Sequence, residues 1–130
     1  MKVKASSQRM SDIMHKVNHH SYDAYFSDFE YDMCLEDDKL YTVVGLTQRS
    51  GATWIYAFPE GLLMELSVFP LVLFDVVEPS FDCPMFMKFV HSRSDDMELV
   101  PAELYPIDYW FEKYIDEVPY VLEVVAKMYS

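Results

Sequence analysis

Three residues near the start of the chain have the types and the spacing of a metal site. Asp12, His15 and His19 lie three and four positions apart, so a helix would place them on one face, where they could ligate a divalent transition metal. A fourth ligand would have to come from elsewhere, and the HExxH pattern is missing. Solvated histidines near a helix C-terminus are the simpler interpretation. We therefore predict no metal site and no cofactor.

The two thiols offer a second kind of chemistry. Cys34 or Cys83 could act as a nucleophile with His91 as its base, although the spacing does not show that these residues meet. The chain contains no GxSxG elbow, and its three glycines form no phosphate-binding loop. Without a CxxC pair, two reduced and mostly buried thiols are the simpler interpretation. The sequence thus predicts a protein that is not an enzyme, with an enzyme of unrecognised type as an alternative.

The most distinctive segment is residues 21–38, SYDAYFSDFEYDMCLEDD, in which seven acids alternate with five aromatic rings and no Lys or Arg occurs. Such a run of like charge repels itself unless a positive partner faces it, and tyrosine rings offer contact area at low entropic cost. We predict that a basic protein binds here. The predicted partner-binding residues are Tyr22, Asp23, Tyr25, Asp28, Glu30, Tyr31, Asp32, Glu36, Asp37 and Asp38.

The formal net charge of -12 is spread unevenly along the chain. Residues 1–20 hold four basic side chains and one acid, whereas the rest holds six basic side chains and 21 acids. Direct binding to DNA, RNA or an anionic membrane is therefore disfavoured, and a basic protein surface is the natural complement. Two alternatives stay open. The charge could serve solubility alone, or Arg9 and Lys16 could neutralise the acidic segment internally.

Length and composition predict one packed domain over residues 1–130. Hydrophobic residues make up 52% of the chain and aromatic residues 16%, which is unlike a disordered acidic tail. No apolar run has the length of a signal peptide core or of a membrane span. A cytoplasmic location is the default expectation.

The N-terminal half predicts a helix followed by strands. Apolar residues at Met10, Ile13, Met14 and Val17 follow helical spacing and predict an amphipathic helix from Ser7 to about residue 20. Alternation in FEYDMCL predicts an edge strand at roughly residues 29–35. The segments LYTVVGL and ATWIYAF, joined by a QRSG turn, predict a hairpin, and FPEGL predicts a type I turn with its proline at the second position.

The C-terminal half predicts further strands and then two helices. Pro70 divides the apolar stretch 62–78 into two strands, MFMKFVH predicts another strand, and SRSDDMELVP predicts a polar connection. Pro106 and Pro119 each predict the first turn of a helix with one apolar face. The expected fold class is α+β. It consists of a central antiparallel sheet of about four to five strands with the N-terminal helix and two C-terminal helices packed against it.

These observations lead to competing functions. The first is a stoichiometric inhibitor that occludes a basic surface of a nuclease, toxin or defence protein. In its clustered acids and tyrosines the chain is similar to bacterial toxin-immunity proteins and phage-encoded inhibitors. The second is an acidic secretion chaperone, a homodimer that would use the apolar stretch around residues 62–77 and the C-terminal helix. A strict monomer would exclude the chaperone, so both a monomer and a homodimer stay open.

Overall fold

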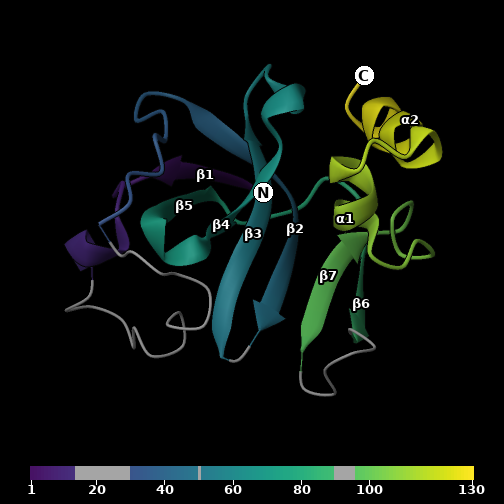
Figure 1. The fold of residues 1–130 in the computed structure, drawn as a ribbon, viewed down its shortest axis with the longest axis horizontal. Coiled ribbons are helices and arrows are strands. Elements are labelled where there is room, and N and C mark those ends of the chain that lie inside the picture. The colour runs from purple at the N-terminus through teal and green to yellow at the C-terminus, as the bar shows by residue number, and fades with distance from the viewer. Residues whose placement is uncertain (14–29, 50, 90–95) are drawn as a thin grey trace.

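The computed structural model describes residues 1–13, 30–49, 51–89 and 96–130, and its main feature is one antiparallel sheet of seven strands (Figure 1). The strands are β1 (Lys2–Ala5), β2 (Leu40–Arg49), β3 (Ala52–Pro59), β4 (Ser67–Pro70), β5 (Phe74–Glu78), β6 (Met85–Phe89) and β7 (Met97–Pro101). The helices are the 3-10 turns η1 (Met10–Ile13), η3 (Leu63–Glu65) and η4 (Leu71–Leu73) and the α-helices α1 (Trp110–Ile115) and α2 (Pro119–Met128). The α+β class with an antiparallel sheet is confirmed, and the sheet has more strands than the four to five predicted.

Strand β2 organises the sheet, because β3 pairs along one of its edges and two short strands share the other. β1 pairs with the start of β2, at Leu40–Thr42, and β7 pairs near its end, at Leu46–Gln48. Between them the register of β2 against β3 shifts, and Gly45 stands there. A Cβ atom on Gly45 would lie 2.7 Å from the carbonyl oxygen of Leu99, so only glycine lets β7 approach this closely. β1 and β7 therefore lie end to end along β2, with β5 and β6 outside them.

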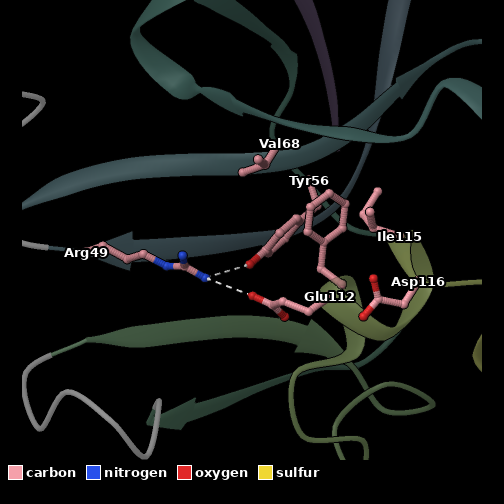
Figure 2. Close-up of a pocket in the computed structure, with 7 residues that line it drawn as sticks. Arg49, Tyr56, Val68, Glu112, Ile115 and Asp116 are labelled. Carbon is pink, nitrogen blue, oxygen red and sulfur yellow. Dashed lines mark hydrogen bonds and ion pairs between the residues drawn. The ribbon is translucent and has the colours of Figure 1, made fainter. Parts of the chain in front are cut away.

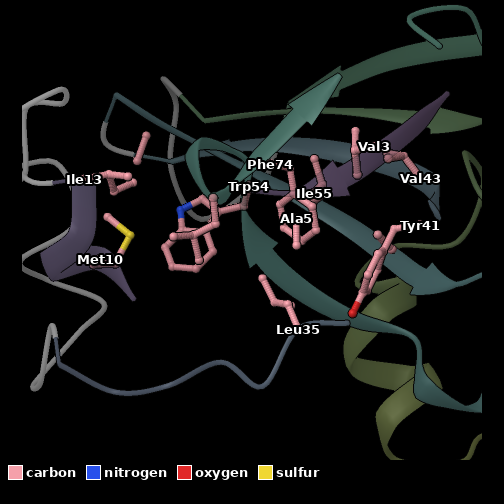
Figure 3. Close-up of a cluster of buried hydrophobic side chains, with 13 residues drawn as sticks. Val3, Ala5, Met10, Ile13, Leu35, Tyr41, Val43, Trp54, Ile55 and Phe74 are labelled. Atoms are coloured by element: carbon pink, nitrogen blue, oxygen red, sulfur yellow. The ribbon is translucent and has the colours of Figure 1, made fainter. Parts of the chain in front are cut away.

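Apolar side chains cover the sheet in two clusters. The first packs η1 and the chain around residue 35 against the sheet (Figure 3). It contains Val3, Ala5, Met10, Ile13, Leu35, Tyr41, Val43, Ala52, Trp54, Ile55, Ala57, Leu73 and Phe74. The second packs α1 and α2 against the sheet and contains Val44, Tyr56, Phe58, Leu66, Val100, Leu104, Ile107, Trp110, Val121 and Val125. Because β3 contributes to both clusters, its sequence is almost continuously apolar.

The predicted N-terminal helix is wrong over the described residues. The chain begins with β1, and only the single 3-10 turn η1 follows, although Met10 and Ile13 are buried as their spacing suggested. Residues 14–20 lie outside the described residues. The side chains of Gln8 and Arg9 bond to residues 30–37. These contacts with a distant segment override the local helical pattern.

The predicted strand at residues 29–35 is also wrong, because residues 30–35 form a loop and Phe29 lies outside the described residues. Cys34 has a left-handed backbone with φ of 55°. Its N–H donates to the carboxylate of Asp32 at 2.8 Å, which makes a local turn. Alternating polarity alone did not reveal this turn, and a left-handed residue interrupts an extended strand.

The β2–β3 hairpin is confirmed, but the turn after it is displaced by one residue. The N–H of Leu62 donates to the carbonyl of Pro59 at 2.9 Å, so Pro59 is the first residue of the turn. Gly61 then occupies the third position with φ of 81°, which fits a type II turn and not the predicted type I turn. The predicted strands on either side of Pro70 are confirmed as β4 and β5, and MFMKF forms β6.

The last part of the chain departs from the prediction at two places. The end of the predicted polar connection, Met97–Pro101, is strand β7, whose pairing with both β2 and β6 fixes it. The first C-terminal helix begins at Trp110 and not at Pro106, because Tyr109 adopts a left-handed backbone with φ of 56° just before it. Pro119 opens α2 as predicted. Both helices pack against the sheet.

Candidate partner-binding site

Six of the ten predicted partner-binding residues lie in one loop, residues 30–38, which we call the acidic loop. They are Glu30, Tyr31, Asp32, Glu36, Asp37 and Asp38. The other four, Tyr22, Asp23, Tyr25 and Asp28, lie outside the described residues. The acidic loop leads directly into β2, and Leu35 anchors it in the first apolar cluster.

The backbone of the acidic loop is held by side chains from two other segments. The Gln8 carboxamide accepts from the N–H of Leu35 at 2.6 Å and donates to the carbonyl of the same residue at 2.9 Å. The N–H of Met33 donates to the carbonyl of Gln8 at 2.9 Å, and the hydroxyl of Tyr41 accepts from the N–H of Glu36 at 3.0 Å. A loop ordered in this way loses little conformational entropy when a partner binds.

Among the described residues, Asp32 and Glu36 of the loop have cationic neighbours. Arg9 contacts Asp32 at 3.1 Å and also donates to the carbonyl of Glu30, while Lys39 contacts Glu36 at 3.1 Å. The side chains of both pairs are 40–44% exposed, so water screens these contacts. Lys16, the other predicted neighbour, lies outside the described residues. Cations of the same chain therefore neutralise part of the negative charge of the acidic loop.

The remaining part of the loop presents an aromatic ring and further acids to solvent. Tyr31 is 62% exposed. Asp37 and Asp38 are exposed and make no ion pair with a Lys or Arg in the described part of the chain, although Asp37 accepts a hydrogen bond from Gln8. An exposed ring with carboxylates on the same short loop is an arrangement suited to a basic partner.

The structure also forms a cleft that the sequence did not predict, with a volume of about 420 Å³ (Figure 2). It lies between β2, β3, β4 and α1 and is lined by Arg49, Tyr56, Val68, Phe111, Glu112, Ile115 and Asp116. Arg49 donates to the hydroxyl of Tyr56 at 3.3 Å, and it lies 3.8 Å from Glu98 and 3.9 Å from Glu112. The Tyr56 hydroxyl donates to Glu98 at 3.0 Å.

We call Arg49, Tyr56, Glu98 and Glu112 the Arg49 cluster. Burial raises the pKa of Glu98, and the hydrogen bond from Tyr56 and the charge of Arg49 oppose that rise. Burial and the neighbouring Glu98 raise the pKa of Tyr56, so its hydroxyl stays protonated and donates to Glu98. Arg49, Tyr56 and Glu98 thus supply one another's hydrogen-bond and charge partners. This geometry ties β2, β3 and β7 together and, through Glu112, ties α1 to them.

No signal in the sequence could have found the Arg49 cluster, since its members come from four elements and follow no motif. The other candidate chemistry lies partly outside the described residues, because His15, His19 and His91 are not among them. Cys34 and Cys83 are free thiols, and Cys34 is exposed, contrary to the expected burial. Among the described residues, no group of three or more His, Cys, Asp or Glu side chains is placed to hold a metal ion.

In residues 1–13, 30–49, 51–89 and 96–130, no helix has both the length and the apolarity needed to span a membrane. Comparisons of the chain with protein-family models, with curated proteins and with solved structures find no match.

Proposed function

We propose that this protein is a binding module that captures a basic surface of another protein and acts as a stoichiometric inhibitor or immunity-type protein for a nuclease, toxin or defence protein. The observation that carries the proposal is the exposed ring of Tyr31 on an acidic loop whose backbone Gln8 holds in place. Tyrosine is enriched among the residues that dominate binding energy, and a preset loop lets more of that energy appear as affinity.

The charge of the described residues supports the same proposal. They include eight Lys and Arg against nineteen Asp and Glu, and of these acids Asp96 is buried. Five of those eight cations already contact carboxylates within the chain: Lys2, Arg9, Lys39, Arg49 and Lys88. A basic partner therefore meets a surface with excess negative charge, which steers association and orients the two proteins.

The test of the loop compares two tyrosines of equal exposure. Partners are captured from a native lysate at low salt, identified, purified and titrated against the wild type, Tyr31→Ala and Tyr120→Ala. Tyr120 lies on α2 and is 63% exposed, against 62% for Tyr31. We expect Tyr31→Ala to weaken binding about tenfold or more, as loss of an interface anchor does, and Tyr120→Ala to leave it unchanged. Equal effects of both substitutions would contradict the proposal.

The proposed electrostatic steering is tested by measuring the association rate constant as a function of ionic strength. The rate should fall as salt rises, because salt screens the steering field. The double substitution Asp37→Asn with Asp38→Asn should flatten that dependence more than the double substitution Glu117→Gln with Glu123→Gln, which removes two exposed acids elsewhere. A rate that does not respond to salt would overturn the proposed steering.

A further inference from the structure

Strand β6 is an outer strand of the sheet with large apolar side chains in solvent. Among the described strands it pairs only with β7, and Phe86, Met87 and Phe89 are 46%, 60% and 62% exposed. Proteins usually protect such an edge with charges, proline or a covering element. The one charged side chain of β6 is Lys88, and its ammonium group is turned to the Tyr105 carbonyl at 3.0 Å and to Asp108 at 3.1 Å. The charge of Lys88 is therefore already paired within the chain and gives the edge little protection.

One face of β6 continues into a wider apolar surface. Met87 is opposite Leu99 of β7, and Leu99 is opposite Leu46 of β2, so these three side chains share a face of the sheet. Met97 lies beside them, opposite Phe89. A shallow cleft of about 280 Å³ opens among these residues. A strand added to the edge would place its own side chains next to this cleft.

We propose that β6 pairs with β6 of a second copy of this chain, antiparallel and around a two-fold axis at Met87. In that register Met87 faces Met87 of the second copy, and Phe89 faces its Met85. Lys88 faces Phe86 of the second copy, so the two cations do not meet. The strand is thus self-complementary, as an isologous interface requires, and the pairing would satisfy the open backbone edge of both copies.

The residue types of β6 favour a second copy over the basic partner as the occupant of this edge. Strand β6 carries one cation and no acid, in a chain of net charge -12, so a basic surface gains little here. A second copy brings a strand of the same apolar character. The whole molecules repel one another, and salt screens that repulsion. Dimerisation through β6 should therefore strengthen with salt, whereas binding of the basic partner through the acidic loop should weaken.

The mass of the protein in solution tests whether β6 forms a dimer interface. Sedimentation equilibrium at low and high salt should show a concentration-dependent dimer in the wild type. Met87→Lys places two ammonium groups opposite each other at the axis and should weaken dimerisation at least about tenfold. Because Met87 is largely exposed, circular dichroism should show that the variant keeps its fold. Met64→Lys is the matched control, since Met64 is 87% exposed on η3, beyond the opposite edge strand of the sheet.

Disulfide formation tests the register, in a background of Cys34→Ser and Cys83→Ser. Residues directly opposite on antiparallel strands have Cα atoms about 4.5–5.5 Å apart, within reach of a disulfide. Met87→Cys should therefore cross-link to itself in the dimer, and Phe89→Cys should not. A mixture of Met85→Cys and Phe89→Cys proteins should yield the mixed dimer.

Three outcomes would overturn the proposal. The wild type could be a monomer at every concentration and salt, the dimer could survive Met87→Lys, or Phe89→Cys could cross-link to itself as readily as Met87→Cys. The proposed function is tested separately, because Tyr31→Ala should leave the dimer intact and Met87→Lys should leave capture of the basic partner intact.

Discussion

Arg9 and Arg49 both join distant segments to carboxylates, but water reaches the two contacts very differently. Arg9 lies 3.1 Å from Asp32, and their side chains are 40% and 44% exposed. Arg49 lies farther from Glu98, at 3.8 Å, yet the side chain of Glu98 is only 11% exposed. The shorter contact is the weaker one, because water screens it, whereas Glu98 has lost most of its hydration and depends on its neighbours. Burial, more than distance, ranks these two ion pairs.

This difference in solvent exposure also separates the roles of the Arg49 cluster and of the Arg9 contact. The Arg49 cluster connects β2, β3, β7 and α1, so its loss would reach the packing of the sheet against the second apolar cluster. The Arg9 contact connects η1 with a surface loop that Gln8 and Leu35 already hold. We therefore expect stability to depend on Arg49 and the orientation of the acidic loop to depend partly on Arg9.

The largest expected effect comes from Arg49→Ala. It leaves Glu98 with the Tyr56 hydroxyl but without a nearby guanidinium, and the free energy of unfolding should fall by about 2 kcal/mol, below the roughly 3–5 kcal/mol of a fully buried pair. Urea denaturation measures this change, with Lys113→Ala on the exposed face of α1 as the control. A change as small as that of the control would show that the cluster does not hold β7 and α1.

A smaller, pH-dependent effect is expected from Glu98→Gln. Because burial raises the pKa of Glu98, the folded state holds a proton that the unfolded state releases just above the ordinary glutamate pKa. Stability contributed by this proton is present below the unfolded pKa and is lost as pH rises through the folded pKa. The variant cannot lose it, so its stability relative to wild type should improve as pH rises across that window. Parallel curves of stability against pH would contradict a raised pKa.

The smallest effect is expected from Arg9→Ala. Because its contact with Asp32 is exposed, the free energy of unfolding should change by about 0.5 kcal/mol or less, and added salt should reduce the difference further. Thermal unfolding at low and high salt measures this. A loss as large as that of Arg49→Ala would reverse the ranking of the two regions.

Local patterns predicted the elements whose own residues determine them. The QRSG turn between two segments rich in β-branched and aromatic residues gave the β2–β3 hairpin, and Pro119 marked the first turn of α2. Pro70 correctly separated two strands, since proline cannot continue a helix. In these segments, backbone preference and tertiary packing favour the same structure.

Contacts between distant segments decided the elements that the patterns missed. Residues 30–35 alternate in polarity as a strand does, but the Asp32 turn and the Gln8 hydrogen bonds use the backbone groups that strand pairing would need. Strand β7 looks like the end of a polar connection until β2 and β6 flank it. Gln8 is distant in sequence from residues 30–35, and β2 is distant from β7, so no local window contains the whole cause.

The candidate site shows the same division between features that local sequence indicates and features that distant contacts decide. Composition marked residues 30–38 as part of a candidate site, because clustered charge and aromatic rings are visible in the sequence itself, whereas the loop conformation and the exposure of Tyr31 came from the structure. The Arg49 cluster and the open edge of β6 arise only when the sheet is assembled.

The sequence by itself determined a packed α+β protein with excess negative charge, since residue types fix hydrophobicity, charge and local turns. Tertiary structure alone decided which acids are neutralised, which side chains lose water and which strand is left at the edge. These properties depend on distances between segments far apart in the chain, and only the assembled sheet sets those distances.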